Sequence, residues 1–201
     1  MIEKLKLACE AMGSRYANIL SQYYPAHGST GFTERNLTNN LVIALERAFG
    51  EACISWFEAP ICLKDGKHID AVVFYENITI LIEAKRLTSV KQQMGSIERD
   101  VERMFSTDTI KTVEKELRSN QNQRRRYSVV LADVWTENDE KTNVYKSWPS
   151  LLPAYFLENL LFSTQLSFDD LCVEGKWKDN YKILVAVSEI KAPQYPKHTA
   201  T

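Results

Sequence analysis

The stretch "HIDAVVFYENITILIEAKRL", His68 to Leu87, decides the predicted fold. Two apolar, β-branched runs flank Glu76-Asn77, and Asn tolerates the left-handed backbone conformation that tight hairpin turns require. The pattern predicts two antiparallel strands, "HIDAVVFY" and "ITILIEAKRL", joined by a short turn. The second strand runs from apolar residues straight into a glutamate and a lysine, so the direction of those charges becomes the central question.

The pairing register follows from an even-length loop centred on the turn. It places Asp70 directly opposite Glu83, and His68 opposite Lys85. Side chains alternate between the two faces of a strand, so Asp70, Glu83 and Lys85 are expected on one face of the hairpin. The opposite face is expected to be core, and it carries Ile69, Ala71, Val73, Tyr75, Ile78, Ile80, Ile82 and Ala84.

Two carboxylates that lie directly opposite each other repel unless positive charge lies between them. A hard divalent cation such as Mg²⁺ takes oxygen ligands, often one or two carboxylates together with water and substrate phosphate. Asp70 and Glu83 are the candidate metal ligands, and the Ala84 carbonyl could add a third oxygen. Lys85 could orient the attacking water or stabilise the charge that develops in the transition state.

Apolar periodicity and turn residues predict the elements around the hairpin. A helix is expected from the N-cap Thr33 to Phe49, where Gly50 ends it. This order predicts an α/β fold with a mixed sheet and helices on its faces. The other expected elements are a strand over 52–63, a helix from Val90 to about Arg118, a strand over 127–135, a helix around 151–162 and a strand over 181–190.

Composition bounds the class of protein. The 201 residues, 44% of them hydrophobic, suffice for one core, expected over 29–192 after a helical appendage (1–28) and before a flexible tail (193–201). The net charge of −1 means that a polyanion site would be a local patch. Cysteines without CxxC spacing and scattered histidines argue against zinc and disulfide frameworks. With no apolar signal core or membrane-spanning run, a cytoplasmic protein with no membrane contact is expected.

Asp70 followed by Glu83-Ala84-Lys85 at the end of an apolar strand resembles the PD-(D/E)XK nuclease superfamily. The resemblance covers Thr33 to about Trp135 and includes the order helix, three strands, helix, strand. It implies a restriction-endonuclease-like α-β-β-β-α-β core and an endonuclease that hydrolyses phosphodiester bonds with Mg²⁺ or Mn²⁺. The implied partner is DNA more than RNA, in restriction, repair or defence. His68-Ile69 precedes Asp70 where the family pattern has proline.

The resemblance also implies a further glutamate on the helix before the sheet, and "FTERNLTNNLVIAL" points to Glu34. Helical spacing puts Glu34 on the face of Leu37 and Leu41, toward the sheet. A glutamate in the first turn is also simply favourable for the helix dipole. Glu46 is the second choice for this role, and Glu58 on the first strand is a third.

Several patterns have a second interpretation without chemistry. Glu and Lys two residues apart are common on exposed strand faces, and the run Arg124 to Arg126 is either a phosphate-binding patch or a solvated loop. Arg99 and Arg103 are either phosphate contacts or part of an ion-paired helix surface. The main rival to a nuclease is an inactive DNA- or protein-binding scaffold of the same fold. A third interpretation is a subunit of a homo-oligomer or a larger complex, with the N-terminal helix as its dimerisation arm.

Overall fold

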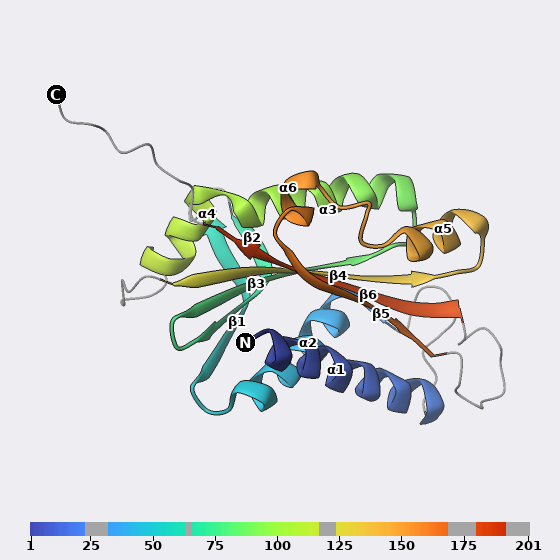
Figure 1. The fold of residues 1–201 in the computed structure, drawn as a ribbon, viewed down its shortest axis with the longest axis horizontal. Coiled ribbons are helices and arrows are strands. Elements are labelled where there is room, and N and C mark those ends of the chain that lie inside the picture. The colour runs from blue at the N-terminus through green and yellow to red at the C-terminus, as the bar shows by residue number, and fades with distance from the viewer. Residues whose placement is uncertain (23–31, 63–65, 117–123, 169–179, 192–201) are drawn as a thin grey trace.

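The computed structural model describes residues 1–22, 32–62, 66–116, 124–168 and 180–191 as a six-stranded mixed sheet with helices on both faces (Figure 1). The strands are β1 (Cys53–Cys62), β2 (Lys67–Tyr75), β3 (Ile78–Arg86), β4 (Arg125–Trp135), β5 (Leu160–Ser167) and β6 (Tyr181–Ile190). The helices are α1 (Ile2–Gln22), α2 (Glu34–Phe49), α3 (Val90–Phe105), α4 (Thr107–Lys111), α5 (Asp139–Ser147) and α6 (Ala154–Leu157), with a π-helical turn, η1 (Thr112–Glu116). The predicted mixed α/β architecture is confirmed.

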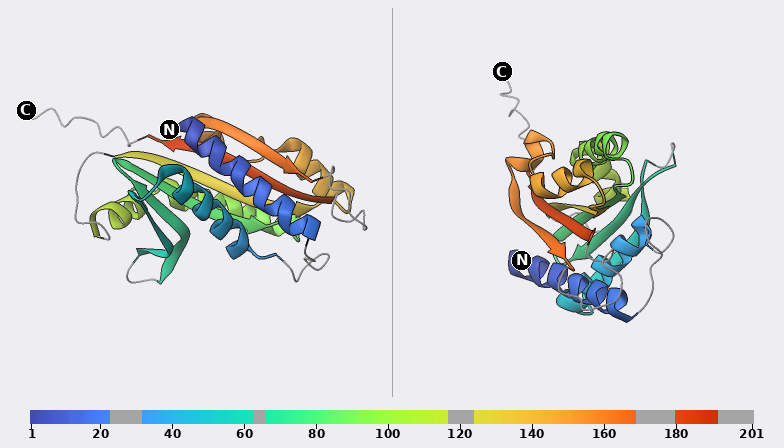
Figure 2. Two further views of the ribbon diagram at one scale, coloured as in Figure 1. Left: turned by 90° about the horizontal axis from the view of Figure 1, so that it is seen from below. Right: turned by 90° about the vertical axis from the view of Figure 1, so that its right-hand side faces the viewer.

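The strand order is β1-β2-β3-β4-β6-β5. Only the β3–β4 pair is parallel among the pairs described, and α3, α4 and η1 lie on the connection between these strands. Helices α1 and α2 lie side by side on one face of the sheet, and α3, α5 and α6 cover the other (Figures 1 and 2). The sheet is therefore buried on both sides, which explains why its central strands are almost continuously apolar.

The hairpin has the predicted register, from Tyr75 opposite Ile78 to Ala71 opposite Ile82. Its turn differs in detail, because Glu76 and not Asn77 takes the positive φ, of 46°.

The expectation that one face of the hairpin is core and the other carries its charges is wrong. Val72, Phe74 and Leu81 are buried beneath α3 in a second core, which Ile69 joins as well. The face toward α1 and α2 holds the rest of the predicted apolar set. A central strand of a sheet that is covered by helices on both faces needs apolar residues on both faces. The charged residues of such a strand therefore lie at its end.

Helix α2 forms as predicted. The Thr33 side chain accepts a hydrogen bond from the Asn36 N–H, and the Asn36 side chain accepts one from the Thr33 N–H, which closes a capping box. Leu37, Leu41 and Leu45 are buried against the sheet. Gly50, with φ of 81°, ends the helix. The rigid cap fixes where the first turn, and therefore Glu34, meets the strands.

Two helices were predicted wrongly. The helix that begins at Val90 ends at Phe105, since Ser106 takes an extended conformation with ψ of 132°, and α4 and η1 follow separately. The helix expected around 151–162 is replaced by the four-residue α6 and by strand β5. Pro153 precedes α6, and β5 alternates between exposed and half-buried residues as the outer partner of β6. An edge strand of this kind has too weak an apolar pattern to be separated from a helix by sequence.

The three consecutive arginines stabilise the sheet. Arg124 is buried and donates to the backbone carbonyls of Glu76 and Ile78 at the β2–β3 turn. Arg125 pairs with Glu189 on β6, and Arg126 binds both carboxylate oxygens of Glu114 in η1. Neither a phosphate-binding patch nor a solvated loop describes this segment.

Helix α1 contributes to the first core through one apolar stripe, formed by Leu5, Ala8, Met12, Tyr16 and Leu20. The flexible tail predicted over 193–201 lies outside the described residues. Within the described ranges, no helix combines the length and the apolar character that crossing a membrane would require.

Candidate active site at the open edge of β3

The site lies where β2 separates from β3. Their ladder ends at Ala71 opposite Ile82, while β2 continues to pair with β1 through Ile69 and His68. Beyond this point none of the described strands pairs with this edge of β3. Asp70 therefore does not pair with Glu83 across the ladder, and His68 lies opposite Pro60 rather than Lys85.

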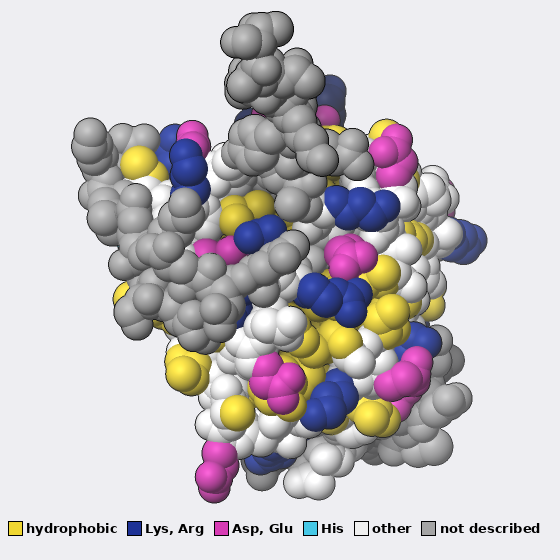
Figure 3. All heavy atoms as spheres, turned by 60° about the vertical axis from the view of Figure 1, so that its left-hand side comes forward, with side chains coloured by type: hydrophobic (Ala, Val, Ile, Leu, Met, Phe, Trp, Pro, Cys, Tyr) yellow, Lys and Arg dark blue, Asp and Glu magenta, His cyan; other side chains and the backbone are white. Residues whose placement is uncertain are grey.

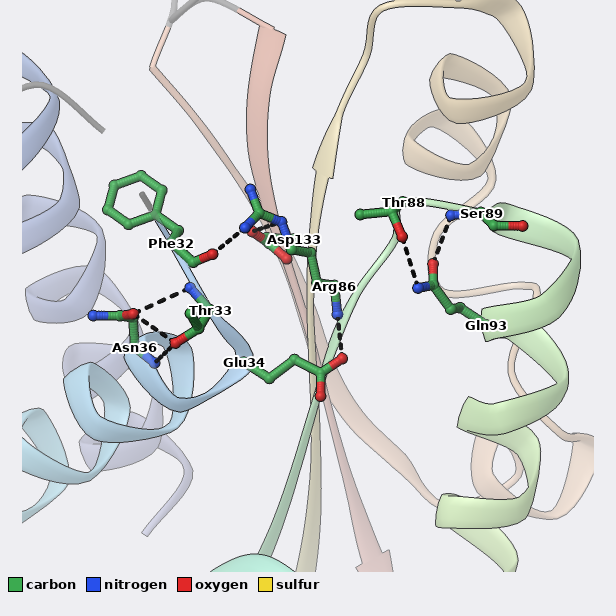
Figure 4. A network of polar contacts seen from close by, with 9 residues as sticks. All are labelled: Phe32, Thr33, Glu34, Asn36, Arg86, Thr88, Ser89, Gln93 and Asp133. Atoms are coloured by element: carbon green, nitrogen blue, oxygen red, sulfur yellow. Dashed lines mark hydrogen bonds and ion pairs between the residues drawn. The ribbon is translucent and has the colours of Figure 1, made fainter. Parts of the chain in front are cut away.

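Two carboxylates occupy the edge that β2 leaves. Asp70 Oδ2 accepts a 2.7 Å hydrogen bond from the Ala84 N–H. Glu34 Oε1, at the N-terminal turn of α2, accepts a 3.0 Å hydrogen bond from the Arg86 N–H (Figure 4). Since the N–H and C=O groups of one strand residue point to the same edge, the Ala84 carbonyl lies on this side of β3 as well. Three oxygen-bearing groups thus gather at the end of one strand.

The side chains of Glu83 and Lys85 extend from β3 toward α3, where they form an ion-pair network. Arg103 Nη2 lies 2.6 Å from Glu83 Oε1 and 2.8 Å from Asp100 Oδ1. Lys85 Nζ lies 2.9 Å from Asp100 Oδ2. The Glu83 side chain is 5% exposed and the Asp100 side chain 9%, so helix α3 holds both groups largely out of water.

The electrostatics of this cluster favour an added cation. Burial and, to a smaller extent, the charge of Asp70 raise the pKa of Glu83 while Arg103 lowers it, and the net result is a pKa of about 8. Burial also raises the pKa of Asp70, against the Ala84 N–H and the charge of Lys85, which lower it. Asp70 and Glu83 are therefore close enough to disfavour each other's charged forms. A divalent cation between them would relieve that repulsion.

The Lys85 ammonium remains a cation in this setting. Burial lowers its pKa, but the hydrogen bond and the charge of Asp100, together with Glu34 and Glu83, raise the pKa overall. It can therefore act through its positive charge at neutral pH.

Two open hollows meet at Glu34 and Arg35. The first, of about 340 Å³, is lined by Glu34, Arg35, Thr38, Asn39, Phe57, Glu58 and Asp70. The second, of about 520 Å³, is lined by Phe32, Thr33, Glu34, Arg35, Arg86, Thr88 and Gln93. Both lie in the size range of ligand sites, roughly 300–1,000 Å³. Both border the first turn of α2, and the two hollows together are called the trough.

The structure brings most of the predicted site residues together. Glu34, Asp70 and Ala84 meet at the edge of β3. The side chains of Glu83 and Lys85 leave the same strand end toward Arg103 and Asp100 of α3, so the single face predicted for Asp70, Glu83 and Lys85 is not formed. The two alternatives to Glu34 differ from each other in position. Glu46 is bound by the Ser55 hydroxyl three turns further along α2, whereas Glu58, with φ of 51°, lines the first hollow.

The donor set fits a hard divalent cation, because carboxylate and carbonyl oxygens are the ligands that Mg²⁺ and Mn²⁺ bind. Asp70, Glu83 and the Ala84 carbonyl would hold it. No group of three His, Cys, Asp or Glu side chains is already arranged as a metal cage in the described part of the chain. One ligand, Glu83, is bound by Arg103, so this side chain would have to reorient for the set to converge.

The sequence leaves Arg103 open between a phosphate contact and an ion-paired surface, and it does not single out Asp100. In the structure Arg103 binds Glu83 and Asp100 binds Lys85. The available signal was their helical phase, since both lie close to the apolar stripe of Ile97, Val101 and Met104.

A second missed feature is a buried ion pair next to the site. Arg86 Nε lies 3.9 Å from Asp133 Oδ2, and the Arg86 guanidinium also donates to the Phe32 carbonyl (Figure 4). Asp133 is fully buried, and this burial raises its pKa to about 7 although Arg86 opposes the shift. The Arg86–Asp133 pair joins the ends of β3 and β4, and the Arg86 side chain also binds the segment before α2. These contacts hold Arg86, whose N–H donates to Glu34.

The chain matches no protein-family model, no curated protein and no solved structure in these three comparisons. Any functional argument therefore depends on the residues and their geometry.

Proposed function

We propose that this protein is a Mg²⁺- or Mn²⁺-dependent nuclease of the restriction-endonuclease-like type, which hydrolyses phosphodiester bonds in DNA. The observation that carries the proposal is the Asp70–Ala84 hydrogen bond, because it joins the first acidic residue of the motif to Glu83-Ala84-Lys85. The position of Glu34 on the same strand edge supports it. The order of α2, β1, β2, β3, α3 and β4 along the chain, which matches the predicted order, also supports the proposal.

Each residue has a distinct role in this proposal. Asp70, the Ala84 carbonyl and a reoriented Glu83 would hold the divalent cation, which would supply Lewis-acid polarisation of the phosphate and of a water nucleophile. Lys85, anchored by Asp100, places a positive charge where the pentavalent phosphate gains negative charge. Glu34 fixes the end of β3 through the Arg86 N–H and borders the trough in which the substrate would lie.

The cation has a second use, because the first hollow is acidic. Glu34, Glu58 and Asp70 line the first hollow with Arg35 as the one basic residue among its lining residues. On the face shown in Figure 3, Lys and Arg side chains alternate with Asp and Glu among apolar side chains. A nucleic-acid backbone would be repelled from the first hollow unless bound cations reverse its local charge.

One observation favours a second candidate, an inactive nucleic-acid- or protein-binding scaffold. Arg103 and Asp100 already neutralise Glu83 and Lys85 within the protein. If this network never opens, the cluster is a stabilising ion-pair group.

Cleavage assays separate the two candidates. Supercoiled plasmid, linear duplex DNA, single-stranded DNA and RNA are incubated with the protein and Mg²⁺, Mn²⁺ or Ca²⁺, the last as a non-catalytic substitute. The nuclease proposal expects products with Mg²⁺ or Mn²⁺ that Asp70→Asn abolishes. Binding without cleavage of any substrate under these conditions would establish the scaffold instead.

A further inference from the structure

The first hollow has one aromatic wall. Phe57 on β1 lies opposite Ala71, the neighbour of Asp70 on β2. The Phe57 side chain lines the hollow that Asp70 and Glu34 also line. Phe57 is 41% exposed, which is unusual for a large apolar side chain in the middle of a strand. An exposed ring beside candidate metal ligands is a surface on which a flat group can stack.

The charges around the hollow restrict what can enter it. Three carboxylates, Glu34, Glu58 and Asp70, line it together with one guanidinium, Arg35, whose Nη2 lies 3.6 Å from Glu58 Oε1. A phosphate group would meet net negative charge there. A neutral, flat group with polar edges would meet the Phe57 ring and the polar side chain of Asn39, which also lines the hollow.

We propose that this hollow receives an unpaired nucleobase next to the scissile phosphate, stacked on Phe57. This inference rests on the proposed nuclease function and names its substrate class. A base inside a duplex already has both faces covered by its neighbours, so it can reach Phe57 only after it is unstacked. The preferred substrate is therefore single-stranded nucleic acid, or a single-stranded end or flap, rather than intact duplex.

Strand β1 offers a matched control. Trp56 is the neighbour of Phe57 and is equally exposed, at 43%. It lies opposite Val72, whose side chain belongs to the α3 face, and it does not line the hollow. Removal of either ring deletes a comparable exposed aromatic surface from the same edge strand, but of the two only Phe57 lines the hollow with the candidate metal ligand Asp70.

The experiment measures binding and cleavage separately. Fluorescence anisotropy in Ca²⁺ gives the affinity of each variant for a labelled single-stranded oligonucleotide and for the duplex of the same sequence. Phe57→Ala should weaken single-strand binding by about 5- to 100-fold, the usual effect of losing one base–aromatic stack, and Phe57→Trp should retain it. Trp56→Ala should change neither affinity by more than about 2-fold, and all variants should unfold at similar temperatures.

A second measurement locates the base. An abasic nucleotide is moved one position at a time along the single-stranded oligonucleotide. Wild type should lose affinity at one position, next to the cleavage site found in Mg²⁺, and Phe57→Ala should be insensitive there.

The outcomes distinguish this inference from the function on which it rests. Efficient cleavage of duplex DNA with unchanged single-strand affinity in Phe57→Ala would overturn the inference and leave the nuclease proposal intact. A selective loss of single-strand binding in Phe57→Ala, with no cleavage by wild type in Mg²⁺ or Mn²⁺, would support the base site and overturn the nuclease.

Discussion

Asp70 and Ala84 belong to strands that have already separated, yet the Asp70 carboxylate hydrogen-bonds the Ala84 N–H at 2.7 Å. This contact gives the carboxylate a structural role, because it satisfies a backbone donor on the open edge of β3. It also holds the Asp70 carboxylate against Ala84, the residue between Glu83 and Lys85. Both roles must be considered when the site is tested by mutation.

Asp70→Asn separates these roles. The amide oxygen can still accept the Ala84 hydrogen bond, but the charge needed for a cation is lost, so cleavage should fall by about 100- to 1,000-fold or more. Without metal, the melting temperature should rise slightly, because burial and the nearby Glu34 and Glu58 disfavour the Asp70 charge. Cleavage rates and thermal unfolding check both points. Glu98→Gln on the exposed side of α3 is the control and should alter neither.

Lys85→Ala removes the cation proposed to stabilise the transition state. Asp100 keeps its contact with Arg103, so the fold should survive. Cleavage should fall by roughly 100-fold or more, as for other groups that stabilise transition-state charge, while DNA affinity falls less. Lys91→Ala, an exposed lysine at the start of α3, provides the comparison in steady-state kinetics and filter binding. Undiminished cleavage in Lys85→Ala would mean that the reaction occurs at another site.

Arg103→Met leaves the Glu83 carboxylate buried without its nearest positive partner. Loss of one member of a buried pair costs up to about 3–5 kcal/mol. Glu83, whose pKa is already raised to about 8, can take up a proton, so the free energy of unfolding should fall by less than this amount. Arg99→Met, on the exposed side of the same helix, should stay within ~0.5 kcal/mol of wild type in urea denaturation.

The same variant tests whether Glu83 can bind a cation. In Arg103→Met no guanidinium competes for Glu83 Oε1, so Mg²⁺ should raise the melting temperature more than in wild type. Thermal unfolding with and without Mg²⁺, and with Glu83→Gln added to the Arg103→Met variant, measures this. An equal response to Mg²⁺ with and without Glu83 would exclude this carboxylate as a ligand.

The raised pKa of Asp133 predicts that the free energy of unfolding depends on pH. Its folded pKa, about 7, is above the ordinary value of 3.8, so the folded state binds the proton more tightly than the unfolded state. The stabilisation is complete below about pH 4 and is lost as pH rises through 7, with a slope of up to about 1.4 kcal/mol per pH unit.

Asp133→Asn removes this titration. The stability difference between wild type and variant should therefore move in favour of the variant between pH 5 and pH 8, whatever its value at pH 5. Chemical denaturation at both pH values provides the test. A difference that does not change with pH would show that Asp133 titrates alike in the folded and unfolded chain.

The central strands and α2 were predictable because their determinants are local. Apolar runs of strand length, the turn at Glu76-Asn77, and the Thr33 cap each act within a few residues of chain. Strand β5 and the helix break at Ser106 were not, because their conformations depend on what packs against them. β5 exists as a strand through its pairing with β6, a partner that lies later in the sequence.

The determinants of the site are likewise partly local and partly tertiary. Sequence by itself determined the hairpin register and the placement of Glu83, Ala84 and Lys85 at the end of an apolar strand, since a short even-length turn at Glu76-Asn77 leaves one register for the two apolar runs. The tertiary structure alone decided that β2 leaves β3 after Ala71, so that Asp70 and Glu34 meet the open edge. It also decided that α3 brings Arg103 and Asp100 to the charges. The reason is physical: local alternation determines which way a side chain points, whereas the partner of a buried charge depends on how distant segments pack.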